Sequence, residues 1–144
     1  MSLDADQFAR DLVRDAADAI VYADKDGVIR FWNAGAARIF GFDAAEAIGQ
    51  SLDIIIPANL RQRHWDGYNA TMHTGRTRYG AGDLLAVPAL RKDGARISVE
   101  FTIMPFHDAG GRMIGIGAIM RDVTKRFEDM KALRAQLHQR GSGA

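Results

Sequence analysis

Residues 91–106, RKDGARISVEFTIMPF, combine a hairpin turn with a regularly alternating strand. Lys92-Asp93-Gly94 indicates the turn, because glycine reaches positive φ without steric cost. After the turn, apolar side chains recur at every second position, at Ile97, Val99, Phe101 and Ile103. The positions between them are polar. A period of two predicts a strand with one buried face, since a helix would repeat every 3.6 residues or so.

The sequence on either side of this stretch predicts four more strands. Upstream, residues 84–90 form a strand candidate, and Pro88 within it favours a sheet edge because proline cannot donate to a ladder. Downstream, residues 113–120 predict the neighbouring strand. Residues 19–32 predict a further hairpin around a turn at 24–27. Together these segments predict one antiparallel sheet of five strands.

Helical segments are predicted between the strands. Asn33 and Asp43 are good N-cap residues for two short helices. Pro57 suits the start of a longer helix that runs to about His73. We therefore expect an α+β fold in which short helices cover one face of the sheet.

Helical periodicity also extends beyond both ends of the predicted sheet. It divides the chain into an N-terminal amphipathic helix at 1–17, a central domain at 18–123, and a C-terminal helix with a flexible tail at 124–144.

The composition excludes several classes of protein. The 144 residues are 47% apolar and 26% charged with a net charge of +1, which fits one globular domain and lacks the basic excess of a nucleic-acid binder. The absence of cysteine excludes disulfides and thiolate chemistry. No apolar run is long enough to span a membrane, and the acidic N-terminus does not resemble a signal peptide, so a cytoplasmic location is expected.

No motif indicates an enzyme or a metal centre. The chain lacks HExxH, GxSxG and GK[ST] motifs. His64 and His73 are nine residues apart, a spacing that does not bring two metal ligands to one helix face. We therefore expect neither catalysis nor a metal site.

Four short motifs, in this order, resemble the PAS family over about 13–126. They are Asp24-Lys25-Asp26-Gly27 before a strand ending at Asn33, Phe40-Gly41-Phe42 followed by Glu46-Ala47-Ile48-Gly49, Arg91-Lys92-Asp93-Gly94, and Arg121-Asp122-Val123-Thr124. The resemblance implies a sensory or protein-interaction module of a bacterial signalling protein, such as a two-component kinase or a transcription regulator. It also implies an output domain in the parent protein.

A sheet with one apolar face under short helices can enclose a pocket beneath the longer helix. The candidate lining residues are Ile29, Phe31, Phe101, Ile103, Ile116, Ala118 and Met120 on the strands, and Ile54, Ile56, Leu60 and His64 on the helical side. Trp32 is expected on the opposite face of the sheet, with Val28 and Arg30, against the N-terminal helix. Two interpretations stay open: a pocket for a small-molecule ligand or partner, and a solid core in a module that only dimerises.

His64 is the candidate cofactor residue. The resemblance extends to haem-binding, oxygen-sensing PAS domains, in which a histidine at this place in the longer helix is the proximal iron ligand. This implies haem as a candidate cofactor and gas or redox sensing as a third candidate function, with a pocket-wall histidine as the alternative. A flavin photoadduct is excluded, because the blue-light relatives form it on a cysteine and this chain has none.

Both terminal helices carry apolar stripes that a domain of this size cannot fully bury. The stripe and connecting residues are Phe8 and Leu12 in the first helix, Asp122 and Thr124 at the junction, and Phe127, Met130, Leu133 and Leu137 in the last helix. Val123, Met130 and Leu137 are spaced by seven, as in a coiled coil. We expect a homodimer through these helices, with the signal passing from the last strand into the last helix. The alternative is that both helices fold back onto their own sheet.

Overall fold

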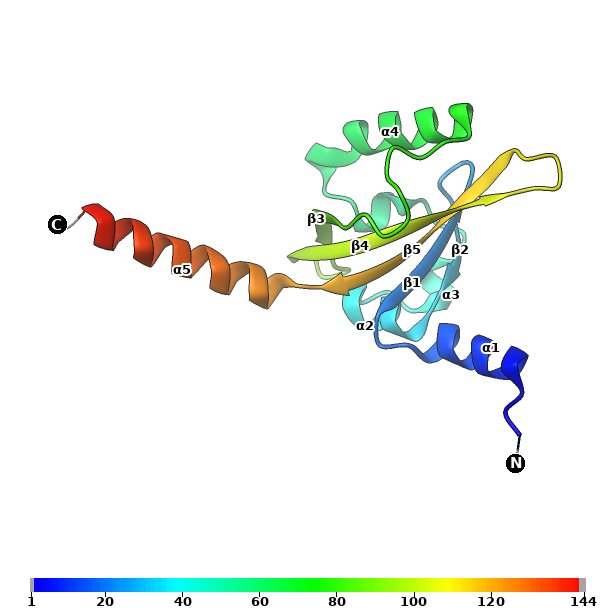
Figure 1. Ribbon diagram of the computed structural model, residues 1–144, viewed down its shortest axis with the longest axis horizontal. Helices are drawn as coiled ribbons and strands as arrows, with labels where there is room; N and C mark the ends of the chain where they lie inside the picture. The colour runs from blue at the N-terminus through cyan, green and yellow to red at the C-terminus, as the bar shows by residue number, and fades with distance from the viewer. Residues whose placement is uncertain (1, 143–144) are drawn as a thin grey trace.

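The alternating segments fold into five antiparallel strands, which confirms the predicted sheet. The computed structural model describes residues 2–142 (Figure 1). Its strands pair in the order β2-β1-β5-β4-β3, so β5 is central and β3 lies at an edge. They are β1 Ala19–Asp24, β2 Ile29–Trp32, β3 Leu85–Leu90, β4 Arg96–His107 and β5 Met113–Asp122. Pro88 is therefore in an edge strand, as expected.

The helical segments begin at residues with capping side chains or turn geometry. They are α1 Ala5–Asp15, α2 Ala34–Phe40, α3 Ala44–Ala47, the 3₁₀ turns η1 Leu52–Ile55 and η2 Ala58–Leu60, α4 Arg61–Thr74, and α5 Thr124–Ser142. Asp43 and Glu46 form a capping box at α3. The longer helix starts later than predicted, at Arg61. The reason is that the chain after Pro57 first closes a 3₁₀ turn, in which the Leu60 N–H donates to the Pro57 carbonyl at 2.9 Å.

The hydrophobic core lies between the sheet and the helices that cover one of its faces. Its largest fully buried side chains are Phe40, Ile29, Ile39 and Val99. Helix α1 contacts α2, whereas α5 projects away from the sheet (Figure 1). Among the described residues, no helix combines the length and apolar character that crossing a bilayer requires.

Strand β2 departs from strict alternation. The opposed pairs across β1 and β2 are Val21 with Trp32, Tyr22 with Phe31, and Ala23 with Ile29. Arg30 is left between two of these pairs, as the extra residue of a β-bulge. Directly opposed residues share a face of the sheet. Ile29 and Trp32 therefore both face the core, and Phe31 faces outward.

The expected outward position of Trp32 and inward position of Phe31 are both wrong. The Trp32 indole is buried, and its Nε1 donates to the Phe42 carbonyl at 2.8 Å. Its ring packs against Phe40, with the centroids 5.5 Å apart. A bulge changes which face each residue presents, and the hydrophobicity of β2 alone does not reveal it.

Asn33 joins three elements at the base of the sheet. Its side chain is 3% exposed. Oδ1 accepts hydrogen bonds from the backbone N–H groups of Ile20 and Ala36, at 2.8 and 2.9 Å. Nδ2 donates to the carbonyls of Val13 and Asp18, at 2.9 and 3.1 Å. The residue predicted only as a helix cap thus also fixes where α1 leaves the domain.

Candidate ligand-binding cavity

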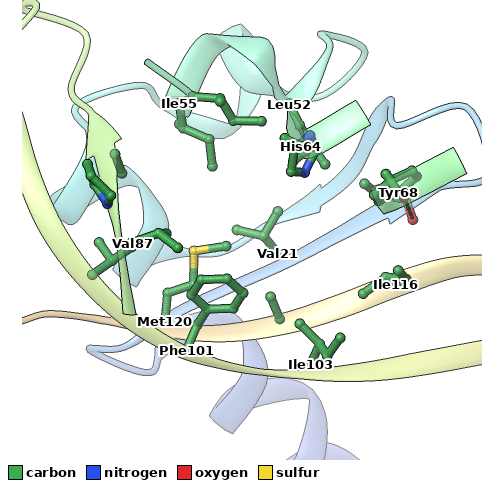
Figure 2. Close-up of a pocket in the computed structure, with 16 residues that line it drawn as sticks. Val21, Leu52, Ile55, His64, Tyr68, Val87, Phe101, Ile103, Ile116 and Met120 are labelled. Carbon is green, nitrogen blue, oxygen red and sulfur yellow. Dashed lines mark hydrogen bonds between the residues drawn. The ribbon is translucent and has the colours of Figure 1, made fainter. Parts of the chain in front are cut away.

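A cavity of about 130 Å³ lies between the inner face of the sheet and the helical layer (Figure 2). Its lining residues are Val21 and Ala23 from β1, Val87, Pro88 and Ala89 from β3, Val99, Phe101 and Ile103 from β4, Ile116, Ala118 and Met120 from β5, and Leu52, Ile55, Ile56, His64 and Tyr68 from the helical side. Val87 is 39% exposed, so the cavity approaches the surface beside β3.

The structure brings together seven of the eleven predicted pocket residues. They are Ile56, His64, Phe101, Ile103, Ile116, Ala118 and Met120. The strand residues among them lie on β4 and β5, whose inward faces keep a regular period of two. The other four, Ile29, Phe31, Ile54 and Leu60, do not line the cavity.

Local geometry explains why Ile29 and Ile54 do not line the cavity. Residues 49–50 cover Ile29 through two backbone hydrogen bonds. The Ile29 N–H donates to the Gln50 carbonyl, and the Ile29 carbonyl accepts from the Gly49 N–H, both at 2.8 Å. Ile54 lies in η1, where a 3₁₀ turn repeats every three residues. That spacing directs Leu52 and Ile55 into the cavity instead of Ile54.

Nine lining residues lie outside the predicted list, and one of them, Val99, continues the predicted inner face of β4. Val21 and Ala23 alternate as strand residues should, but only the position of β1 beside β5 directs that face to the cavity. Tyr68 carried a usable signal, because it follows His64 by four residues and so shares its helix face.

His64 lines this apolar space and carries a buried nitrogen. Among residues 2–142, its Nδ1 atom has no hydrogen-bond partner. The imidazole contacts the rings of Trp65 and Tyr68, with centroids 4.7 and 5.6 Å away. Burial lowers the pKa of His64 below its ordinary value, although the nearby charge of Asp53 opposes the shift. The imidazole is therefore neutral at pH 7.

Tyr68 anchors α4 to the first strand. Its hydroxyl donates to the carbonyls of Ala23 and Asp24, at 3.3 and 2.5 Å. Burial raises the pKa of Tyr68 well above its usual range, so the hydroxyl keeps its proton. Both hydrogen bonds go to the main chain, and the side chain therefore positions the helix.

Trp65 holds the same helix over the β1–β2 turn. Its Nε1 donates to Oδ1 of Asp53 at 2.7 Å. The indole lies directly on Gly27, where a Cβ would come within 2.1 Å of the ring. Gly27 has a φ of 76°, a conformation that also favours glycine. Trp65 and Tyr68 together fix one side of the cavity roof.

The comparisons with known proteins agree with this architecture. The family model of the PAS fold matches residues 13–128. The chain belongs to the PAS family. This PAS domain is 34% identical over 125 residues to an uncharacterized protein of Azorhizobium caulinodans, covering 86% of this chain and 17% of that protein. It is 29% identical over 125 residues to Sensor protein FixL of Bradyrhizobium diazoefficiens, covering 87% of this chain and 24% of that protein.

A solved structure gives the same result for the fold. The crystal structure of a PAS domain from Colwellia psychrerythraea matches with a TM-score of 0.70 at 25% identity, over 85% of this chain and 99% of that one. The chain spans at most a quarter of the curated relatives named above, 17% and 24% of their lengths. PAS domains are sensory modules of signalling proteins and are generally not catalytic themselves.

A porphyrin does not fit the cavity that this PAS domain forms. The cavity holds about 130 Å³, whereas pockets for drug-sized molecules, which are smaller than haem, hold roughly 300–1,000 Å³. The imidazole of His64 is also flanked by the rings of Trp65 and Tyr68. The arrangement therefore does not suit haem. No group of three or more His, Asp or Glu side chains in the described part of the chain is placed to hold a metal ion.

Proposed function

We propose that this PAS domain is a sensory module that binds a small molecule in the cavity and relays its presence through α5 to an output domain. The observation that carries the proposal is the cavity itself, an apolar space of about 130 Å³ built on the central strand of the sheet. A void of this size costs stability, and a ligand that fills it recovers the lost contacts. A module that only dimerised would gain nothing from leaving the space open.

The relay is supported by the path from the cavity to α5. Ile116, Ala118 and Met120 line the cavity from β5, and this strand ends at Asp122. Oδ1 of Asp122 accepts from the backbone N–H of Thr124, at 2.9 Å, at the start of α5. A displacement of β5 by a ligand would therefore change the direction in which α5 leaves the domain.

The start of α5 is also bonded to β4, which forms another part of the cavity wall. Oγ1 of Thr124 accepts from the Ser98 N–H at 3.0 Å. The Val123 N–H donates to the Ser98 carbonyl at 2.9 Å. Arg126 forms an ion pair with Glu100. Two cavity-lining strands therefore set the geometry of one helix.

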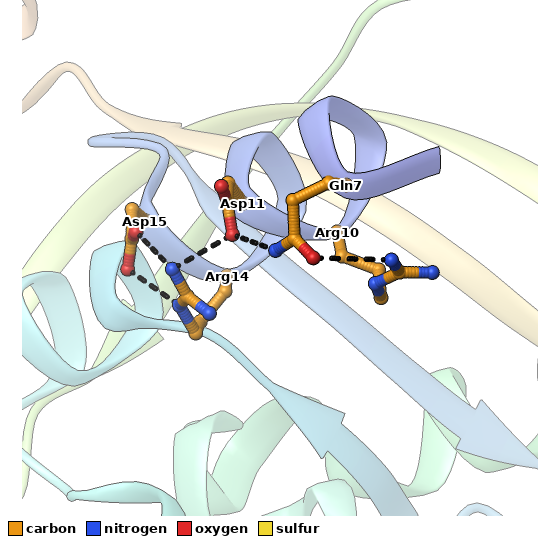
Figure 3. Close-up of polar contacts among 5 residues, drawn as sticks. All are labelled: Gln7, Arg10, Asp11, Arg14 and Asp15. Carbon is orange, nitrogen blue, oxygen red and sulfur yellow. Dashed lines mark hydrogen bonds and ion pairs between the residues drawn. The ribbon is translucent and has the colours of Figure 1, made fainter. Parts of the chain in front are cut away.

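Dimerisation belongs to this proposal because both terminal helices leave apolar side chains in solvent. The exposed residues are Phe8 and Leu12 on α1, and Phe127, Met130, Leu133 and Leu137 on α5. On α1, the polar side is linked by bonds among Gln7, Arg10, Asp11, Arg14 and Asp15 (Figure 3). PAS domains in sensor kinases commonly dimerise and connect to output domains, and a second copy of α5 would cover the exposed stripe.

Filling the cavity tests the proposal. Ala118→Phe places a ring in the cavity, whereas Ile119→Phe adds a ring on the exposed face of the same strand and serves as the control. Toluene should raise the unfolding temperature of the wild type and of Ile119→Phe, but not that of Ala118→Phe. Equal toluene effects on all three proteins would contradict ligand binding in this cavity, and so would a wild type that responds to neither toluene nor phenol.

A separate distance measurement tests the relay from the cavity to α5. Because the chain has no cysteine, a spin label on Gln136→Cys reports from α5 alone. In a dimer, the distance between the two labels should change when toluene fills the cavity, and should not change in Ala118→Phe. An unchanged distance despite bound toluene would exclude the relay and leave ligand binding intact.

A further inference from the structure

Resting on this sensory function, we propose a ligand class for the cavity. The ligand is a neutral, mainly apolar molecule of about six to nine non-hydrogen atoms that forms one hydrogen bond with Nδ1 of His64. Size, polarity and charge each support a part of this proposal.

The size follows from the volume of the cavity. It measures about 130 Å³, close to the roughly 150 Å³ of an apolar protein cavity that accepts benzene. One six-membered ring with one or two substituent atoms therefore fills it. Two fused rings would have to displace the lining, including Tyr68, which anchors α4.

The polarity follows from the side chains that line the space. Of the sixteen lining residues within the described chain, only His64 and Tyr68 carry polar side-chain atoms. The Tyr68 hydroxyl already donates to the Ala23 and Asp24 carbonyls. Nδ1 of His64 is buried and has no partner among residues 2–142. A buried polar atom without a partner is costly, so a ligand that bonds to it is preferred over an apolar molecule of the same shape.

The preference for a neutral ligand follows from the missing counter-charge. No Lys or Arg is among the lining residues of the described chain. Burial keeps His64 neutral, and the charge that acts on it is the negative one of Asp53. An anion would therefore enter without a compensating cation, which is strongly unfavourable in an apolar site. A neutral imidazole nitrogen can accept from a hydroxyl or donate to a carbonyl, according to its tautomer.

Three probes of nearly equal size test the proposal: phenol, toluene and benzoate. Their dissociation constants would be measured by NMR titration of the full chain. In His64→Leu, phenol should bind about three- to tenfold more weakly, and toluene should change less than twofold. His73→Leu, an exposed position on the same helix, should leave both constants unchanged. Benzoate should not bind to the wild type.

A second readout requires no variant. In the wild type, the ¹⁵N resonance of His64 Nδ1 should shift when phenol is added and stay in place with toluene. If His64→Leu loses equal affinity for phenol and toluene, and phenol does not shift the Nδ1 resonance of the wild type, the proposed hydrogen bond is wrong. Tighter binding of benzoate than of phenol would overturn neutrality. Both results leave the sensory function intact, because the cavity still binds; only a wild type that binds none of the probes overturns both proposals.

Discussion

Asn33 and His64 are both polar side chains placed among apolar ones, but their hydrogen bonding differs. The Asn33 amide is buried and donates and accepts in full, so its role is to hold α1, β1 and α2 together. His64 keeps Nδ1 without a partner among residues 2–142. A buried group that is satisfied stabilises the fold, whereas an unsatisfied one in a cavity-lining residue leaves a hydrogen bond that a ligand could supply.

The burial of His64 predicts a dependence of stability on pH. Its pKa lies below the ordinary value of 6.5 in the folded chain. As pH falls below about 6.5, the unfolded chain therefore takes up this proton before the folded chain does, and stability is lost. Between pH 8 and pH 5, the free energy of unfolding measured in urea should fall less for His64→Leu than for the wild type. His73→Leu should behave as the wild type; equal slopes for all three proteins would contradict the effect of burial.

At the scale of elements, two helices use glycine for different reasons. Gly67 lies in the middle of α4, and a Cβ at this position would meet nothing within 4 Å. Gly35 lies in α2, where a Cβ would come within 2.1 Å of the Asp18 carbonyl oxygen. The first glycine costs helix stability without a packing reason, while the second allows α2 to approach the chain between α1 and β1.

Alanine at these two positions should therefore have opposite effects. Gly67→Ala should raise the free energy of unfolding by about 0.5–1 kcal/mol, the usual gain of alanine over glycine inside a helix. Gly35→Ala should lower it by about 1–3 kcal/mol or more, because backbone must move. Urea denaturation measures both. A loss of stability in Gly67→Ala would indicate that α4 needs the flexibility of this glycine.

On the scale of the whole molecule, three surfaces of the described chain each expose several large apolar side chains. Besides α1 and α5, the outer face of the sheet exposes Met104, Phe106 and Ile119. Phe106 packs edge-on against Tyr22, with ring centroids 5.3 Å apart, so this face is ordered. A monomer would leave all three surfaces in water, which favours association.

Charges on the α5 stripe should decide whether this helix is the interface. Met130 and Leu137 are 47% and 60% exposed and spaced by seven residues. The double substitution Met130→Glu and Leu137→Glu should convert a dimer into a monomer, as measured by sedimentation. Lys131→Glu with His138→Glu places two similar changes beside the stripe and should preserve the dimer. If the protein stays a dimer with Met130→Glu and Leu137→Glu, the interface lies on α1 or on the outer sheet face instead.

The small cavity also predicts the absorption of the purified protein. Because a porphyrin exceeds a space of about 130 Å³, protein from cells supplied with haem precursors should show no Soret band. Hemin added to the pure protein should leave the unfolding temperature unchanged. A stoichiometric Soret band that disappears in His64→Leu but not in His73→Leu would show that α4 moves to admit haem.

The elements and their order were predictable from sequence because their signals are local. The alternation from Ile97 to Ile103 and the capping box at Asp43 are each contained in a few residues. The inward faces of β4 and β5 follow from the same period of two. Five of the seven predicted residues that line the cavity are therefore on these two strands, and the PAS fold is as expected.

Local sequence patterns thus predict the sheet, its helical cover and the helix that carries His64, whereas packing between distant segments sets which side chains meet. The bulge at Arg30 turned Trp32 inward and Phe31 outward. The three-residue period of η1 replaced Ile54 with Leu52 and Ile55. The volume of the cavity had no local signal at all, because a void is the space that several distant segments fail to fill together.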